Sequence, residues 1–296
     1  MIKNHTPAPY VAWLLFAIVI FGWGTSFLGI QAAIQGFTVL GLVTVRNLLA
    51  AIGAAAIAWT LREPWPDRDE LPLVLGQGLL LVLGGNIFSA ASQRFLSTGV
   101  AGLLNSGISL WVVALSRRFE PVSKRTWLGV VIGLFGVALL LLPGEKLRVH
   151  PVGVLCMLAS TFTFSLGAVI QRRHPPKGGT FSVMSVQMLL TTAITACIAV
   201  PSGGFTVGPL TLKVWSSLLF LVIFSSLLAY AAFAGLSKMW PPSRFGTYSV
   251  ITPIVAVALG AIALKEPLTL KMLTAMAITL FGVAMVQRRS LRAGSV

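Results

Sequence analysis

Charged residues are scarce in this sequence, and acidic residues are the scarcest. Only 10% of the 296 residues are charged, and seven of them are Asp or Glu, whereas about a quarter of the residues in a soluble globular protein are charged. This deficit excludes an ordinary water-soluble domain. The acidic residues and the three histidines lie in predicted loops or at the ends of apolar runs, and they form no recognisable catalytic cluster, metal-binding set or phosphate-binding loop. We therefore expect neither an enzyme nor a bound metal or cofactor.

Cysteine is also rare, and the positive charge is dispersed. Cys156 and Cys197 lie inside apolar stretches, so no disulfide framework is expected. The formal net charge of +15 could indicate a nucleic-acid-binding protein, but such proteins gather Lys and Arg on one polar face. Here these residues are scattered between long apolar runs. The basic excess therefore indicates orientation in a membrane, and we expect no nucleic-acid partner.

Long apolar runs are what the sequence has in place of charge. About twenty apolar residues, rising 1.5 Å each, cross a hydrocarbon core of about 30 Å, and ten runs have this length. They predict an all-α, polytopic protein of ten transmembrane helices surrounded by lipid. The first run is longer than the hydrophobic region of a cleaved signal peptide, so we expect it to be retained. The predicted spans are 11–33, 38–60, 71–92, 97–116, 127–142, 151–171, 181–200, 211–236, 243–264 and 270–287.

The distribution of Lys and Arg between the loops predicts the orientation. Positively charged loops are retained in the cytoplasm. With the N-terminus inside, fifteen Lys and Arg residues fall on the cytoplasmic side and six on the other, and Arg46 alone lies within a span. This bias predicts a bacterial-type inner-membrane protein with both termini in the cytoplasm.

Two short motifs recur at one spacing. The repeated pairs are 134–138 with 280–284, both Leu-Phe-Gly-Val-Ala, and Glu120-Pro121 with Glu266-Pro267, each offset by 146 residues. The recurrence divides the chain into a first five-helix repeat, 1–145, and a second, 146–296. Because five is odd, the second repeat should be inverted in the membrane, as in many secondary transporters whose substrate site lies near the bilayer midplane. A scaffold or a membrane enzyme enlarged by duplication is the alternative.

Three local features accompany the paired halves. They are Trp23-Gly24-Thr25-Ser26-Phe27 in the first span, Arg46 in the second, and Pro253 thirteen residues before Glu266. With these features the chain resembles the EamA-type repeats of the drug/metabolite transporter superfamily and, within it, the YddG-type exporters of aromatic amino acids. The resemblance implies export of amino acids. One departure is Gly107, which stands where the family's first-repeat proline would fall and keeps the backbone N–H that proline lacks.

Several intramembrane residues are candidates for binding a solute. Arg46 could attract a carboxylate, because a charge inside a span is by default a functional candidate, or it could snorkel to a helix end. Aromatic residues on one stripe of the first span could stack on a solute or only pack. Uncharged polar residues at depth suit a zwitterionic or polar solute, or else join helices by hydrogen bonds. The predicted substrate-binding residues are Trp23, Phe27, Arg46, Gln77, Asn86, Asn105, Tyr230 and Tyr248.

Glycine and proline interrupt several of the spans. Broken backbone at membrane depth needs protein or water to satisfy it, so these positions could flex during gating, although close packing is the alternative. The predicted hinge residues are Gly84, Gly85, Gly107, Gly246 and Pro253.

The leading hypothesis is an alternating-access exporter of amino acids, with aromatic ones preferred. Its rival is an efflux carrier for cationic drugs or other metabolites. Such a carrier usually has an anionic residue in its cavity, and the predicted spans contain none. Proton-coupled carriers commonly use an intramembrane Asp, Glu or His, so facilitated efflux is favoured over direct proton coupling. A scaffold would need no polar cavity. The sequence predicts no oligomeric state.

Overall fold

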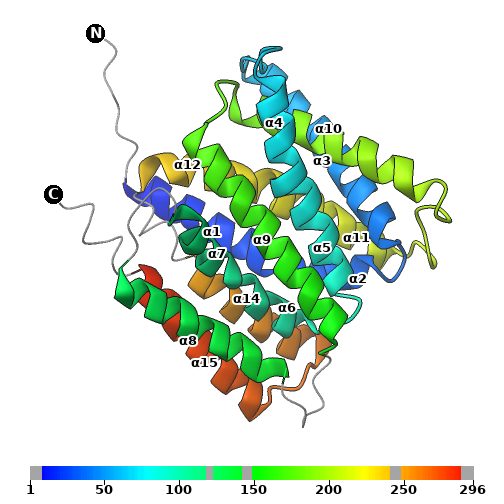
Figure 1. Cartoon of the computed structure of the whole chain (residues 1–296). Helices are drawn as coiled ribbons and strands as arrows, with labels where there is room; N and C mark the ends of the chain where they lie inside the picture. The colour runs from blue at the N-terminus through cyan, green and yellow to red at the C-terminus, as the bar shows by residue number, and fades with distance from the viewer. Residues whose placement is uncertain (1–8, 118–122, 142–148, 241–247, 288–296) are drawn as a thin grey trace.

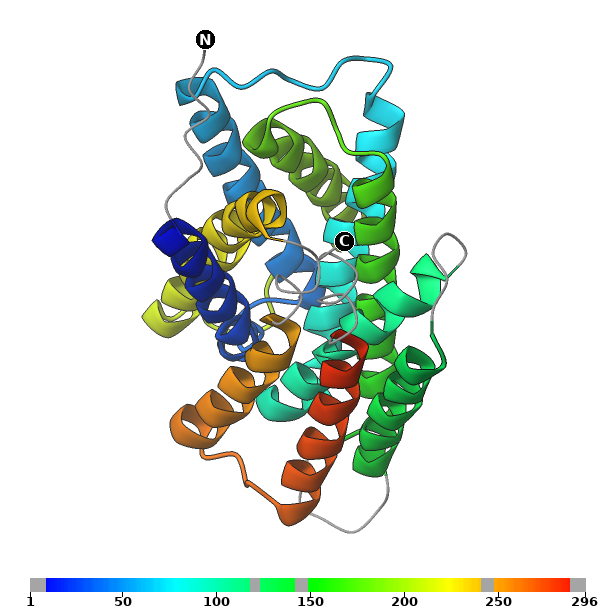
Figure 2. The same ribbon diagram turned by 90° about the vertical axis from the view of Figure 1, so that its left-hand side faces the viewer.

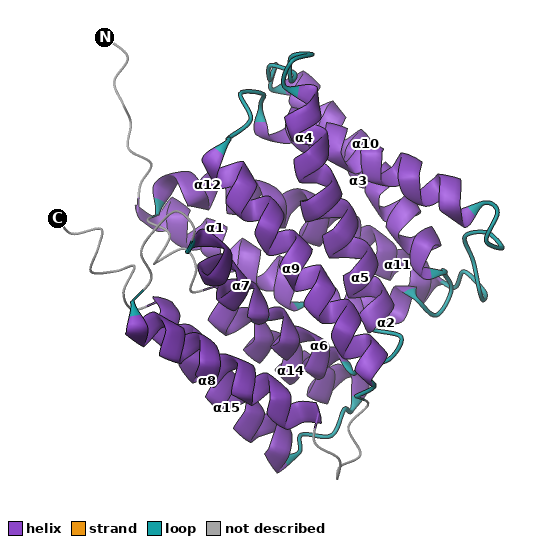
Figure 3. Ribbon diagram, in the orientation of Figure 1, coloured by secondary structure: helices purple, strands orange, loops and turns teal. Residues whose placement is uncertain are grey.

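The computed structural model describes residues 9–117, 123–141, 149–240 and 248–287. This part of the chain is built from helices joined by short loops, and it contains two isolated β-bridges but no strand (Figure 3). The all-α prediction is therefore confirmed for the described residues.

Helices form over every predicted span, and several of them are broken. The first half of the chain forms α1 (Pro9–Gly24), α2 (Ser26–Ala33), α3 (Val39–Thr60), α4 (Leu71–Gly78), the π-helix η1 (Leu79–Gly84), α5 (Gly85–Ser92), α6 (Thr98–Asn105), α7 (Gly107–Ser116) and α8 (Lys124–Leu141). The second half forms α9 (Pro151–Arg173), α10 (Thr180–Ala199), α11 (Leu212–Phe220), the π-helix η2 (Leu221–Leu228), α12 (Ala229–Met239), α14 (Tyr248–Leu264) and α15 (Leu270–Gln287).

Seven helical stretches of the described residues are long and apolar enough to cross a membrane. They cover seven of the ten predicted spans, and their mean hydropathy lies between 1.6 and 2.2. Helices α8, α14 and α15 form over the other three predicted spans. The protein is therefore a multi-pass membrane protein, and the count of ten transmembrane helices stays a prediction.

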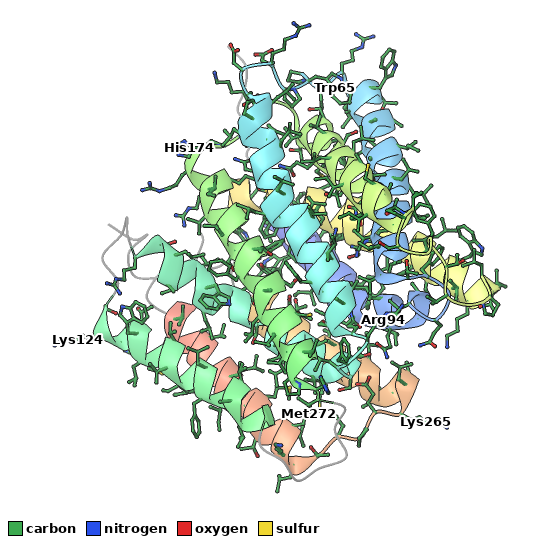
Figure 4. All side chains as sticks on the ribbon, turned by 45° about the vertical axis from the view of Figure 1, so that its right-hand side comes forward. Trp65, Arg94, Lys124, His174, Lys265 and Met272 are labelled. Carbon is green, nitrogen blue, oxygen red and sulfur yellow. The ribbon has the colours of Figure 1, made fainter. Side chains whose placement is uncertain are left out.

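The loops gather in two sets at opposite ends of the helices. At one end, the Gly179 amide donates to the carbonyl of Pro64 over 2.8 Å, and the Lys177 amide donates to Glu70 Oε1 over 2.5 Å. At the other end, the Thr38 amide donates to the carbonyl of Phe205 over 2.9 Å. In Figure 4, Trp65 and His174 lie at the first end, and Arg94 and Lys265 lie at the second. Loops that the sequence places on one side of the membrane thus contact one another, although which side is cytoplasmic stays a prediction.

Helices from the two halves of the chain pair with one another. Helix α3 packs on α10, α6 on α14, and α8 on α15; α8 (green) and α15 (red) lie side by side in Figures 1 and 2. The contact between α8 and α15 is reciprocal. A Cβ atom at Gly136 would clash with Thr279, and one at Gly282 would clash with the backbone of Gly133. The motif that recurs at 134–138 and 280–284 therefore provides the small residues through which these two helices approach closely.

The two π-helices lie at corresponding places in the two halves, each in the middle of the third helical stretch. Helix α1 approaches η2 at Gly22, where a Cβ atom would lie 2.6 Å from the Phe224 carbonyl oxygen. Helix α9 approaches η1 at Gly167, where a Cβ atom would lie 2.7 Å from Leu81 Cγ. π-Helical turns are rare and are frequently found at functional sites. The space between these two segments is therefore a candidate functional site.

The predicted interruption at Pro253 differs from the structure. Helix α14 runs unbroken through this proline, and Thr252 Oγ1 donates to the Tyr248 carbonyl over 2.8 Å. Threonine side chains and neighbouring helices can satisfy backbone groups near an intramembrane proline, so a proline does not by itself end a helix in a membrane. The predicted hinge Gly246 lies outside the described residues. The clear breaks are instead at Thr25, between α1 and α2, and at Ser106, between α6 and α7.

Candidate functional site

A polar cavity of about 80 Å³ lies between the helices of the two halves. Its walls come from α1, α2, α3, η1, α5, α6, α7, α9, η2 and α12. Six of the eight predicted substrate-binding residues line it: Trp23, Phe27, Arg46, Asn86, Asn105 and Tyr230. The other lining residues are Ser26, Ile30, Leu81, Gly85, Ser89, Ile108, Ser160, Phe164 and Ser225.

Arg46 supplies the positive charge of the cavity. It lies on α3, which packs against η2, and it is only 6% exposed. Its Nε atom donates to Ser226 Oγ over 2.9 Å, and one terminal nitrogen donates to Ser225 Oγ over 3.1 Å. No carboxylate of the described residues pairs with it. A buried cation without a counterion is unfavourable, so this site is complementary to an anionic group.

Aromatic rings form one end of the cavity wall around Trp23. The Trp23 ring lies with its centroid 5.5 Å from that of Tyr230 and 6.1 Å from that of Phe164. Both contacts are edge-to-face, the arrangement that the ring quadrupoles favour. The Trp23 Nε1 atom donates to the carbonyl of Ser225 over 3.3 Å. The indole thus satisfies a carbonyl of η2 while its ring borders the cavity.

Neutral polar groups complete the wall on the side of α5 and α9. Asn86 Nδ2 donates weakly to Asn47 Oδ1 on α3, over 3.4 Å. Ser160 Oγ, on α9, donates to the carbonyl of Gly85 over 2.8 Å. Asn105 is the last residue of α6, directly before the break at Ser106. Irregular backbone at membrane depth must be satisfied by protein or water, and here the Ser160 side chain satisfies one such carbonyl, that of Gly85.

Phe27 joins the cavity to the packing of α6 against α14. Its side chain is 4% exposed and belongs to a cluster with Val100, Leu103 and Ala256. It lines the cavity from α2, just beyond the break at Thr25. A change of this ring would therefore alter both the cavity and the contact between the two halves.

Two of the predicted binding residues do not line the cavity. Gln77 is 1% exposed, and its Nε2 atom donates to the carbonyl of His174 at the end of α9, over 2.9 Å. Tyr248 is buried at the start of α14, with its ring centroid 5.4 Å from that of Trp23. Gln77 thus contacts the end of α9, and the Tyr248 ring packs on Trp23 without lining the cavity.

Three of the predicted hinge residues lie where helix geometry changes. Gly84 ends η1 and Gly85 begins α5, so both stand at the junction between π- and α-helix. Gly107 begins α7 after the break at Ser106. Gly85 also lines the cavity. Whether these junctions move stays a prediction.

Three residues that contact the predicted ones directly were not predicted: Ser225, Ser226 and Asn47. The two serines form an adjacent polar pair in the otherwise apolar run from Leu218 to Ala229. That pair was the available signal, because Arg46 is the charge that two hydroxyls at the same depth would meet. Phe164 and Ser160 gave no signal that distinguishes them from other residues of α9.

Two of the described acidic residues, Glu63 and Glu266, accept hydrogen bonds at the starts of helices. Glu63 Oε2 accepts from the amides of Phe181 and Ser182, at the start of α10, over 2.8 and 3.0 Å. Glu266 accepts from the amides of Thr98 and Gly99, at the start of α6, over 2.7 and 3.0 Å. Within the described ranges, no three His, Cys, Asp or Glu residues lie close enough together to hold a metal ion.

Comparison with known proteins identifies similar sequences and folds. The model of the EamA-like transporter family matches residues 11–142 and again residues 151–288. The uncharacterized inner membrane transporter YedA of Escherichia coli is 26% identical over 274 residues, which cover 92% of this chain and 89% of that protein. A probable amino-acid metabolite efflux pump of Salmonella typhimurium is 24% identical over 269 residues, covering 86% and 87%. One solved crystal structure has a TM-score of 0.68 at 20% identity, and the match covers 96% of this chain and 99% of that one.

Proposed function

This chain belongs to the EamA-like transporter family and is a membrane transporter, and from that premise we propose that it exports small solutes by alternating access. Amino acids are the proposed substrates, with aromatic ones preferred. The Salmonella relative named as a probable amino-acid metabolite efflux pump supports export of this class. The likeness to YddG-type exporters within the superfamily stays a prediction, as does the placement of both termini in the cytoplasm.

The two halves are proposed to be inverted five-helix units that enclose the cavity. In a two-fold contact, residue i of one unit meets residue j of the other, while j meets i. The contacts of Gly136 with Thr279 and of Gly133 with Gly282 have this form, because each residue of one pair lies 146 positions from a residue of the other. The proposed boundary between residues 145 and 146 falls between the two family matches. Such units supply two related gates around one site.

The proposed carboxylate of the substrate is inferred from Arg46. Two hydroxyls hold its guanidinium at the edge of the cavity, and no acid among the described residues neutralises it. A substrate carboxylate would supply the missing counterion and accept charge-assisted hydrogen bonds. The rival hypothesis of a cationic drug is disfavoured, since a cation would be repelled by Arg46 at close range.

Binding of an aromatic substrate requires a cavity larger than the one in this structure. An apolar cavity that admits benzene has a volume of about 150 Å³, and this cavity measures about 80 Å³. The Trp23 ring contacts the rings of Phe164 and Tyr230, and all three residues border the space. We propose that opening at the helix breaks separates these rings so that a substrate ring enters between them.

Transport by the purified protein in proteoliposomes tests the proposal. We expect radiolabelled phenylalanine to leave loaded proteoliposomes faster than protein-free liposomes, with or without a pH gradient. Arg46→Gln should slow this efflux at least about tenfold, because a hydrogen bond to a charged group contributes ~1.5–3 kcal/mol. Arg94→Gln removes a positive charge outside the cavity and should leave the rate within about twofold.

The variants must be compared as folded protein, so each is first checked for a single peak in size-exclusion chromatography. If phenylalanine leaves no faster than from protein-free liposomes, the amino-acid proposal fails. If phenylalanine moves equally fast in wild type and Arg46→Gln, Arg46 does not bind the substrate carboxylate.

A further inference from the structure

The charge in the cavity has one sign only. Arg46 is the charged residue among those that line it. Glu63 and Glu266 accept hydrogen bonds from backbone amides at the starts of helices, and Glu70 accepts one from the Lys177 amide in the loop between α9 and α10. Asp67 and Asp69 are exposed in the loop before α4. None of these five acids lines the cavity. Glu120 and Glu145 lie outside the described residues.

An α-ammonium group therefore has weak partners in this site. The neutral acceptors at the wall are the side chains of Asn86, Asn105 and Tyr230 together with serine hydroxyls. The Asn86 Nδ2 atom donates to Asn47 Oδ1, so Asn86 can offer an ammonium group only its neutral Oδ1 atom. An ammonium group also lies close to its own carboxylate and so close to Arg46, and like charges in a site of low dielectric repel each other. The lining thus offers a carboxylate a full positive charge, whereas it offers an amino group only neutral acceptors and aromatic rings.

We propose that the site selects the carboxylate alone, so that it carries organic monocarboxylates without an α-amino group at least as well as amino acids. Aromatic 2-oxo acids and arylalkanoic acids are the chemical class that fits Arg46 together with the Trp23 and Phe164 rings. This inference rests on the proposed function, in which Arg46 binds a substrate carboxylate.

The membrane potential is the driving force for export of such a substrate. A zwitterion carries no net charge across the membrane, whereas a monocarboxylate carries one negative charge. The membrane potential, negative inside, acts on a moving charge and pushes an anion outward. Export of a monocarboxylate thus needs no proton relay. The cavity lining of the described residues agrees with this, because it contains neither an acidic residue nor a histidine.

Wild-type protein in proteoliposomes tests the inference without any substitution. Three probes share a phenyl ring and differ in charge: phenylpyruvate has the carboxylate alone, phenylalanine has both groups, and phenethylamine has the ammonium alone. We expect phenylpyruvate to leave at least as fast as phenylalanine, and phenethylamine to leave no faster than from protein-free liposomes. A potassium gradient with valinomycin, set negative inside, should speed phenylpyruvate efflux several-fold and leave phenylalanine efflux unchanged.

The outcomes separate this inference from the proposed function. If phenylalanine moves and phenylpyruvate moves more than about tenfold slower, the carboxylate-only inference is overturned and amino-acid export stands. If neither moves faster than from protein-free liposomes, both are overturned. If phenethylamine moves as fast as phenylalanine, recognition by the carboxylate is wrong.

A variant that adds a negative charge to the cavity provides a second test. Asn86→Asp places a carboxylate on the cavity wall, where it can pair with Arg46 or with a substrate ammonium group. The ratio of phenylpyruvate to phenylalanine efflux should fall about tenfold, a difference of ~1.4 kcal/mol. Gln35→Glu makes the same change of charge at an exposed residue outside the cavity and should leave the ratio unchanged. An unchanged ratio in Asn86→Asp would overturn the inference.

Discussion

The two π-helices share a backbone irregularity but differ in what they offer to the cavity. Around η1, Ser160 satisfies the carbonyl of Gly85, and the π-helix itself reads Leu-Leu-Leu-Val-Leu-Gly. Around η2, Trp23 satisfies the carbonyl of Ser225, and the segment reads Leu-Val-Ile-Phe-Ser-Ser-Leu-Leu. Only η2 presents hydroxyls to a buried arginine.

This difference distinguishes features that set the shape of the helix bundle from the one contact that sets the charge of the cavity. Features that occur in both halves, such as the π-helices and the close approaches at Gly22 and Gly167, set the shape of the bundle. The contact of Arg46 with Ser225 and Ser226 occurs once and gives the cavity its charge. Variants of the shared features should therefore change stability similarly in both halves, whereas variants of the single feature should change transport.

The largest expected effect comes from enlarging the two close-approach glycines. Gly22→Leu and Gly167→Leu each force a side chain into the neighbouring π-helix, which should lower stability by about 3 kcal/mol or more. The midpoint of thermal unfolding in detergent, followed by tryptophan fluorescence, measures this loss. Gly76→Leu is the matched control, because no atom lies within 4 Å of a Cβ at Gly76. If only one of the two variants is destabilised, the halves are not architecturally equivalent.

Removing the two hydroxyls of η2 should affect transport next most strongly. The double variant Ser225→Ala with Ser226→Ala leaves Arg46 without its two partners, and we expect KM for a carboxylate substrate to rise about tenfold. Ser225→Ala combined with Ser226→Thr keeps one hydroxyl and should restore part of the affinity. Ser216→Ala, on the exposed face of α11, should leave KM unchanged. A double variant with wild-type KM would remove the distinction between η2 and η1.

The N-termini of α3 and α10, one helix from each half, allow a test of structural equivalence between the halves with a smaller expected effect. Thr38 caps α3 with its own side chain, which accepts from the Gly41 amide over 2.8 Å. The N-cap Gly179 of α10 has no such side chain, and Glu63 from the loop before α4 takes that role. Thr38→Ala and Glu63→Gln should each lower stability by about 1 kcal/mol, measured as a shift in the thermal midpoint.

Asp69→Asn is the control for Glu63→Gln, because it changes the charge of an exposed residue in the same loop. It should leave the thermal midpoint unchanged. Equal midpoints for Glu63→Gln and Asp69→Asn would show that the Glu63 carboxylate does not stabilise α10.

The smallest expected effect lies where α3 and α10 face each other. Thr44 Oγ1 donates to Thr195 Oγ1 over 2.8 Å in a buried contact. Hydrogen bonds between membrane helices contribute ~0.6 kcal/mol on average, so Thr44→Val should barely lower the thermal midpoint and should not change KM. A shift as large as that of the glycine variants would contradict this assignment.

Single residues show how far the sequence could predict the site. Arg46 was predicted because a lone charge within an apolar run is conspicuous, and Asn86, Asn105 and Tyr230 were predicted because polar groups are rare at depth; all four line the cavity. Gln77 gave the same signal, yet it bonds the end of α9. Depth along a helix can be read from sequence, but the direction of a side chain depends on which helix lies opposite.

The breaks in the helices were less predictable than the helices themselves. Pro253 gave the strongest local signal, and α14 continues through it. Thr25 and the residues of η2 gave little signal, and the backbone departs from regular α-helix there. Neighbouring helices supply the hydrogen-bond partners that an irregular backbone needs in a membrane. The packing of the helices therefore decides where the irregular segments lie.

Local composition and a repeated motif were enough to predict that this chain lies in a membrane, where its helices form and that its halves are related. Transfer of apolar side chains into lipid depends on local composition, and the repeat is visible in the chain. The fold is needed to show that Arg46 contacts two serines from the other half, that Trp23 borders the same cavity and that Gln77 does not. These contacts join residues up to 202 positions apart, and no local property of the chain specifies such distant pairs.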